Sequence, residues 1–232
     1  MSAAQRRTGC RPRGGSRRPG RDTVYLNVDH GGVAGDPVAV RLSWLCVTDK
    51  GRPTRLAFHD HGVRAAILVD LALARRIGVS QGQVGLDTTP TGMDLADKML
   101  AWIARNRDLT VGAMIARGPG SVIDVLLPGA SRRQRAVQSR FLRVPTVCTA
   151  AQREAIVEAC ASPASITPRL AALTVLACAL RLADGHDCDA MLRRCGPGHD
   201  VLREAVTYLD RLRTKFDYVV SVGRQGTGAG GW

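Results

Sequence analysis

Aromatic residues are scarce in this chain of 232 residues, in which Phe, Trp and Tyr together make up 4%. Apolar residues nevertheless reach 45%, so the core must consist mainly of Leu, Val, Ile and Ala. Long apolar runs are also missing. The longest are 65–74, which Asp70 interrupts, and 170–180, and both fall short of the ~20 residues that span a bilayer. We therefore expect a soluble or peripheral protein located in the cytoplasm.

Motifs of known catalytic chemistry are absent as well. The sequence has neither a Gly-x-Ser-x-Gly elbow nor a Gly-x-x-x-x-Gly-Lys-Ser/Thr phosphate loop, and no pair of carboxylates stands out for acid–base work. The seven cysteines are an odd number without paired spacing, which argues against a disulfide framework. We expect a protein that is not an enzyme, with no catalytic residues and no cofactor.

Two groups of histidine and cysteine invite a metal-binding interpretation. In His59-Asp60-His61 the two imidazoles lie on opposite sides of an extended chain, or ~200° apart on a helix, so they cannot easily share one ion. The second group surrounds a Gly-Pro-Gly loop, does not have the spacing of a known zinc finger or ribbon, and comprises His186, Cys188, Cys195 and His199. We expect no metal site.

Positive charge is abundant and unevenly distributed. Lys and Arg number 33 against 20 Asp and Glu, which gives a net charge of +13, and 30 of the 33 are Arg. Residues 1–22 contain seven Arg and one Asp, whereas residues 125–153 contain six Arg and no acid. These concentrations favour a polyanionic partner, either nucleic acid or an anionic membrane surface. The alternative is a solubilising tail with a solvated loop, and the abundance of Arg, Ala and Gly is typical of a GC-rich bacterial genome.

The periodicity of the apolar residues predicts a mainly all-α fold. Helices are expected over 37–48, 62–79, 94–105, 150–161, 169–183 and 199–221. The second and fifth of these are nearly all apolar, which places them at the centre of a helical bundle. Residues 80–91 are predicted to form loops and turns, and Gly and Pro break the helical pattern over 109–130.

The bundle is expected to form one domain between two less ordered ends. Residues 1–22 consist largely of Arg, Gly, Pro and Ser, a composition that predicts a disordered arm. Residues 222–232 are Gly-rich and are expected to form a flexible tail. The domain therefore covers 23–221.

A basic segment over 132–149 is predicted to form a β-hairpin that projects from the bundle. Phe141, Val144 and Val147 have the spacing of a strand or loop, and Pro145 breaks the pattern. The candidate interface residues of this hairpin are Arg132, Arg133, Arg135, Arg140, Phe141, Leu142 and Arg143. Such a mixture suits insertion at a membrane interface, and the apolar pair could equally mediate self-association.

Several motifs follow one another in an order that is typical of one protein family. Residues 62–77, GVRAAILVDLALARRI, combine an aliphatic run, one acidic residue and a basic end, and Thr89-Pro90-Thr91-Gly92 leads into DLADKMLAWI over 94–103. A turn, Asp49-Lys50-Gly51-Arg52, precedes these motifs, and an apolar helix that begins with Arg169-Leu170-Ala171-Ala172-Leu173 comes after them. In this order the motifs resemble the Golgi phosphoprotein 3 family of lipid-binding peripheral proteins.

The resemblance implies a helical bundle with a projecting hairpin and a non-enzymatic adaptor at a membrane surface. In eukaryotes the family binds phosphatidylinositol 4-phosphate in a shallow basic pocket and holds the cytoplasmic tails of glycosyltransferases. The pocket positions that the resemblance implies are Arg64 at a helix start, Arg55 where the family has Trp, and Arg117 near two later Arg. Because the family's hairpin also self-associates, the resemblance further implies a homo-oligomer and membrane enzymes as partners.

Two alternatives stay open at this stage. Arg64 could form a salt bridge with Asp60 or with an acid in a loop instead of contacting a headgroup. The arm over 1–22 could bind nucleic acid, although the usual binding motifs and aromatic stacking platforms are missing.

Overall fold

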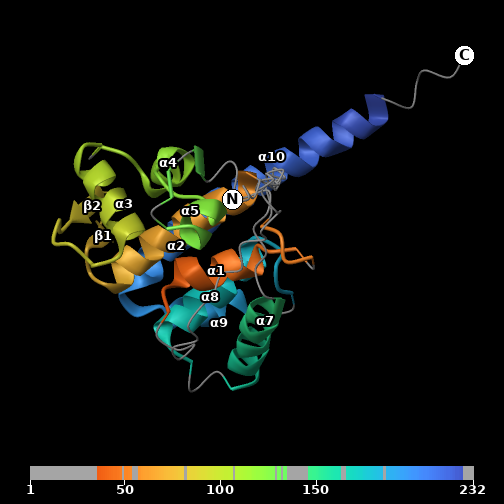
Figure 1. Cartoon of the computed structure of the whole chain (residues 1–232), viewed down its shortest axis with the longest axis horizontal. Helices are drawn as coiled ribbons and strands as arrows, with labels where there is room; N and C mark the ends of the chain where they lie inside the picture. The colour runs from red at the N-terminus through yellow and green to blue at the C-terminus, as the bar shows by residue number, and fades with distance from the viewer. Residues whose placement is uncertain are drawn as a thin grey trace, which may run out of the picture.

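The computed structural model describes residues 36–48, 50–53, 57–80, 83–106, 108–128, 130–131, 133–134, 146–162, 166–184 and 187–226. Over these ranges the chain is mainly α-helical and contains one two-stranded antiparallel sheet (Figure 1). The predicted fold class, mainly all-α with a β-hairpin, is confirmed.

The elements follow one another as short and long helices around one hairpin. The helices are α1 (Val38–Leu45), α2 (Ala57–Leu73), α3 (Asp94–Ala104), α4 (Val111–Arg117), α5 (Val122–Leu126), α7 (Thr146–Ala161), α8 (Pro168–Ala179), α9 (Cys188–Arg193) and α10 (His199–Gly226). A 3₁₀ turn (Gly196–Gly198) precedes α10, and the strands are β1 (Ile77–Ser80) and β2 (Gln83–Leu86). In the part of the chain that is described, no helix combines the length and the apolarity needed to cross a membrane.

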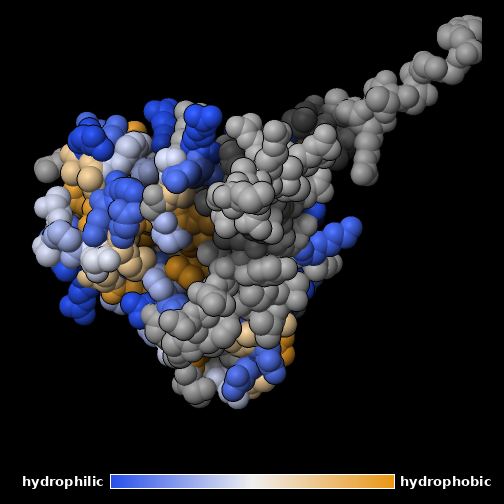
Figure 2. All heavy atoms as spheres, in the orientation of Figure 1, coloured by the Kyte–Doolittle hydropathy of each residue, from blue (hydrophilic) through white to orange (hydrophobic). Residues whose placement is uncertain are grey.

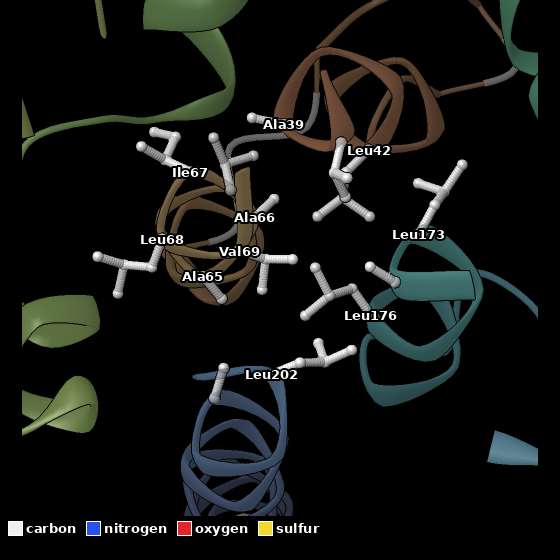
Figure 3. Close-up of a cluster of buried hydrophobic side chains, with 14 of the residues drawn as sticks. Ala39, Leu42, Ala65, Ala66, Ile67, Leu68, Val69, Leu173, Leu176 and Leu202 are labelled. Atoms are coloured by element: carbon white, nitrogen blue, oxygen red, sulfur yellow. The ribbon is translucent and has the colours of Figure 1, made fainter. Parts of the chain in front are cut away.

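Helix α2 is the centre of the molecule. Its residues 65–69 are at most 1% exposed, and the helix packs against α1, α8 and α10. Leu42 of α1, Val69 of α2, Leu176 of α8 and Leu202 of α10 point into the space between these four helices (Figure 3). Each fully buried Leu contributes roughly 2 kcal/mol of apolar burial. The predicted central position of the two most apolar helices is therefore correct.

Both central helices end earlier than predicted, α2 at Leu73 instead of residue 79 and α8 at Ala179 instead of residue 183. Beyond each end an arginine adopts the left-handed conformation, Arg75 with φ 57° and Arg181 with φ 55°. The N–H groups of this arginine and of the next residue donate to carbonyls of the last helical turn, at 2.9 and 2.8 Å in both helices. Glycine is the usual residue at such a helix end, so arginine gave no signal, and the predicted ends at residues 79 and 183 were wrong.

The described hairpin lies directly after α2. Strands β1 and β2 pair antiparallel with Ile77 opposite Leu86, in a region predicted to be the end of a helix and a loop. Ile77 is buried on the bundle, while the alternating Gly78 is exposed. The two-residue alternation of β1 extends over four residues, too few to distinguish it from the helical pattern that precedes it. The prediction of a loop over 80–91 was wrong at β2.

Two parts of the predicted hairpin over 132–149 are helical. Ser131 and Gln134 form a reciprocal cap, in which the Ser131 N–H donates to Gln134 Oε1 (2.9 Å) and the Gln134 N–H donates to Ser131 Oγ (3.3 Å). At the other end α7 begins at Thr146, four residues before the predicted start, and the buried Thr149 hydroxyl donates to the Trp44 carbonyl (2.9 Å). The extended conformation predicted there was wrong, and residues 135–145 lie outside the described residues.

The regions around the bundle also differ from the prediction in detail. The broken stretch over 109–130 contains α4 and α5, which are capped by the Thr110 and Ser121 hydroxyls. Helix α10 continues through Gly226, five residues past the predicted end, and its second half projects beyond the body of the molecule (Figure 1). The arm over 1–22 and residues 227–232 lie outside the described residues.

Candidate functional site

Arg64, the first of the predicted headgroup residues, lies in α2 beside the connection between α4 and α5. Its Nε donates to the Gly120 carbonyl (2.8 Å), and its Nη1 donates to the carbonyls of Ile115 (2.9 Å) and Ala116 (3.2 Å). These carbonyls belong to the end of α4 and the loop after it, where a helix leaves its last acceptors unpaired. Arg64 therefore caps the C-terminus of α4 from a neighbouring helix.

Asp60, the acid considered as a partner of Arg64, has a different role. It accepts the N–H of Val122 (2.9 Å) at the start of α5. Burial raises the pKa of Asp60, while this hydrogen bond and the charge of Arg64 lower it. Asp60 and Arg64, one turn apart on α2, thus hold the two sides of the α4–α5 connection.

Gly120 allows this connection to approach α2. Its φ of 116° is in the region that favours glycine, and a Cβ atom there would lie 2.8 Å from Ile67 Cδ1. A larger residue would push the loop away from α2 and from the guanidinium of Arg64.

Arg117, another predicted headgroup residue, lies in a more open position. It is exposed at the end of α4 and borders a depression of about 580 Å³ between α4 and α10. Arg203 and Arg211 of α10 line the same depression. We call this site the basic depression and define it by Arg117, Arg203 and Arg211.

Arg203 and Arg211 were not among the residues that the sequence indicated. With Thr207 between them they repeat every four residues, so they lie along one face of α10. This spacing was readable in the sequence, but nothing in it showed that this face of α10 would lie beside α4. The contact between the two helices brings the three arginines together.

The charges of the basic depression are only partly compensated. Arg203 Nη2 lies 3.5 Å from Asp200 Oδ1, and Glu204 lies in the lining. Within the described ranges, Arg117 and Arg211 have no ion-pair partner. The depression therefore presents guanidinium groups that an anionic ligand could bind, opposed by one carboxylate.

Tyr208 forms a wall of the basic depression. Its ring stacks on His61, with 6.1 Å between the ring centroids and 29° between the planes. Gly112 of α4 leaves room for it, because a Cβ atom there would lie 2.9 Å from Tyr208 Cδ2. Burial raises the pKa of the Tyr208 hydroxyl and the charge of Arg64 lowers it, so Arg64 acts electrostatically on this wall.

The remaining predicted interface residues cannot be placed in the site. Arg133 lies in the described range 133–134 and is exposed. The others lie outside the described residues, namely Arg55, Arg132, Arg135, Arg140, Phe141, Leu142 and Arg143.

The histidines and cysteines show no arrangement for metal binding where the structure describes them. No group of three or more His, Cys, Asp or Glu side chains in these ranges could hold an ion. The Cys195 thiol is buried, donates to the Met191 carbonyl (3.4 Å), and has a pKa that burial raises to about 12. It is therefore a packed thiol rather than a thiolate ligand, and His186 lies outside the described residues.

A second depression, of about 440 Å³, is mainly apolar. Ile67, Leu95 and Val125 contribute to its lining, and the ion pair between Asp94 and Lys98 (2.6 Å) lies at its edge. Apolar surface is visible among hydrophilic side chains on this face of the bundle (Figure 2). Because this site lacks convergent cations, it is less suited to a phosphate than the basic depression.

Comparison with known proteins identifies the same family that the order of motifs resembles. Residues 44–209 match the family model of Golgi phosphoprotein 3 (GPP34), a range that contains Arg64, Arg117 and Arg203. No curated protein and no solved structure matches the chain. Since the match covers more than half of the chain, the protein belongs to the Golgi phosphoprotein 3 (GPP34) family.

Proposed function

We propose that this protein is a peripheral membrane protein that binds a phosphate-bearing lipid headgroup in the basic depression. The observation that supports this most strongly is the convergence of Arg117, Arg203 and Arg211, from two helices, on one depression of about 580 Å³. Membership of the family is compatible with a lipid-binding adaptor. In this proposal the protein is non-enzymatic and acts at the cytoplasmic surface of a membrane.

The side chains of the depression suit a phosphomonoester better than a phosphodiester. A guanidinium group presents paired N–H donors that match two phosphate oxygens. A monoester near neutral pH carries between one and two negative charges, so several arginines stabilise it more than they stabilise a singly charged diester. A phosphatidylinositol 4-phosphate-like headgroup is therefore the proposed ligand class.

Arg64 has an indirect role in this proposal. The carbonyls at the end of a helix carry partial negative charge, which would repel a phosphate beside Arg117. By donating to the carbonyls of Ile115 and Ala116, Arg64 neutralises this end of α4. We therefore regard Arg64 as a positioning residue of the site and Arg117 as a contact.

The other expected contacts remain part of the proposal. Arg55 and the basic segment over 132–143 would add further contacts with the membrane. Phe141 and Leu142 would mediate self-association, and cytoplasmic tails of membrane enzymes would be additional partners. The basic depression can be tested without them, because its three arginines lie in the described part of the chain.

The test is flotation of the full chain with vesicles of phosphatidylcholine that contain phosphatidylinositol 4-phosphate, phosphatidic acid or phosphatidylglycerol at matched total charge. Each of R117A, R203A and R211A should weaken binding to the two monoester vesicles roughly fivefold, since a basic residue near such a surface contributes ~1 kcal/mol. The triple variant should lose roughly a hundredfold. R153A, which removes an exposed arginine of α7, is the matched control.

Equal losses in R153A and in the variants of the depression would show that only net charge matters. Failure of the wild type to float with any anionic vesicle would refute the proposal. Binding of duplex DNA at the same salt concentration tests the nucleic-acid alternative, which rests on the arm over 1–22 outside the described residues.

A further inference from the structure

The apolar face of α10 continues beyond the part of the helix that the core covers. Leu202 and Leu209 are fully buried, Leu212 is half-buried, and Phe216 is 56% exposed. At ~100° per residue these four positions fall within a sector of about 80°. Phe216 thus lies on the core-facing side of α10, in the second half of the helix. This half projects beyond the body of the molecule (Figure 1).

Basic residues flank Phe216 on both sides. At the same ~100° per residue, Arg213 lies ~60° from Phe216 on one side and Lys215 lies ~100° from it on the other. Arg211 lies ~140° from Phe216, on the face of the basic depression. Asp210 is paired with Arg213 (3.1 Å). This part of α10 therefore combines an exposed aromatic ring with an excess of positive charge.

The other acidic residue near Phe216 is Asp217, and it is also paired. Asp217 lies 3.5 Å from Arg181, which follows α8. In the described ranges Arg211 and Lys215 have no ion-pair partner. The net positive potential of the segment is thus not cancelled by its own carboxylates.

We infer that residues 211–217 of α10 form a second contact with an anionic bilayer. Phe216 enters the boundary between headgroups and acyl chains, while the flanking Arg213 and Lys215 meet lipid phosphates. This inference rests on the proposed function and adds an apolar anchor to it. Headgroup binding in the basic depression and insertion of Phe216 would use different faces of the same helix, α10.

The charge pattern favours a lipid surface over a second copy of the chain. Two copies that met through Phe216 would bring Arg213 and Lys215 of one beside those of the other, and like charges repel. The other large apolar residue with high exposure in the described chain is Val157 of α7, at 64%. It lies between the exposed Glu154 and Glu158, so it lacks the basic flanks and serves as a matched control.

The first experiment measures depth of insertion. F216W and V157W are mixed with phosphatidylcholine–phosphatidylglycerol vesicles whose acyl chains carry bromine, and quenching of the added tryptophan is measured against the parent chain. We expect strong quenching and a blue shift for F216W and neither for V157W. Equal behaviour of the two variants while both bind the vesicles would overturn the inference.

The second experiment measures the contribution to binding by flotation. F216S should lower partitioning roughly tenfold, because it removes the partly exposed ring from the interface, whereas V157S should stay within about twofold of the wild type. Both should unfold at the wild-type temperature, since both side chains are exposed. Normal flotation of F216S beside a defective triple arginine variant would refute this inference and leave the proposed function intact.

The remaining outcomes separate the two proposals further. A smaller particle for F216S in light scattering, with unchanged flotation, would show that Phe216 pairs copies of the chain and would overturn the inference. Absence of wild-type binding to every anionic vesicle would refute the proposed function itself.

Discussion

Charged side chains on α2 cap neighbouring helices, whereas those around the basic depression face a site that a ligand can reach. On α2, Arg64 caps the end of α4, and Asp70 accepts the N–H groups of Val38 and Ala39 (2.9 Å each) at the start of α1. Around the depression, Arg117 and its neighbours on α10 remain available to a ligand. An arginine at a position that resembles the family's pocket is therefore a binding candidate only when the fold leaves its N–H donors free.

Asp70 shows how far this internal use of charge extends. Helix α1 begins after Pro37 without a cap from a local side chain, so two of its first N–H groups would be unpaired. The Asp70 carboxylate, 7% exposed, supplies both acceptors from α2. The acidic residue within the aliphatic run thus joins two core helices.

The largest expected effect comes from R64A. It leaves the carbonyls of Ile115, Ala116 and Gly120 without their charged donor, so the free energy of unfolding in urea should fall by roughly 3 kcal/mol. R117A should change it by less than about 0.5 kcal/mol, because Arg117 is exposed and unpaired in the described structure. If R64A were as stable as R117A but failed to bind vesicles, Arg64 would be a direct headgroup contact. The distinction between a structural Arg64 and a ligand-binding Arg117 would then be wrong.

The second prediction concerns the pH dependence of stability. Burial raises the pKa of Asp70 from 3.8 to about 6, partly offset by its two backbone hydrogen bonds. Between these values the folded state binds more protons than the unfolded state, so the contribution of Asp70 is full below pH 3.8 and is lost as the pH rises through about 6. The free energy of unfolding should therefore fall by roughly 2 to 3 kcal/mol over this pH range because of Asp70.

Urea denaturation at several pH values from 4 to 7 tests this, with D70N as the comparison. The amide does not titrate, so D70N should show a flatter curve than the wild type over this range. Hydrogen bonds lower the pKa of Asp87 to about 2, so its titration falls below the tested window. Parallel curves for wild type and D70N would contradict the prediction.

The smallest expected effect comes from E204Q. Among the described residues, Glu204 is the one carboxylate in the lining of the basic depression, and this change removes it while keeping the shape of the side chain. Binding to phosphatidylinositol 4-phosphate vesicles should strengthen about twofold to threefold, an effect that added salt should reduce. E158Q on α7 changes the net charge equally and is the control. The same gain in E158Q would show that the effect is not local to the depression.

Local motifs of the family have a direct structural basis in this chain. Asp97 accepts hydrogen bonds from the Thr91 N–H (2.6 Å), the Thr91 hydroxyl (2.7 Å) and the Gly92 N–H (3.3 Å). These bonds lower the pKa of Asp97 and fix the loop that enters α3. Because all partners lie within six residues, the sequence alone could indicate this arrangement.

The sequence by itself determined the mainly helical class, the family, and the central position of α2 and α8, because apolar periodicity and local capping act over a few residues. It did not determine where α2 ends, since Arg75 adopts a conformation that usually marks glycine. Only the tertiary structure decided that Arg64 is used internally while Arg203 and Arg211 join Arg117. The physical reason is that the availability of an arginine depends on carbonyls and carboxylates from helices distant in sequence, which approach only when the core packs.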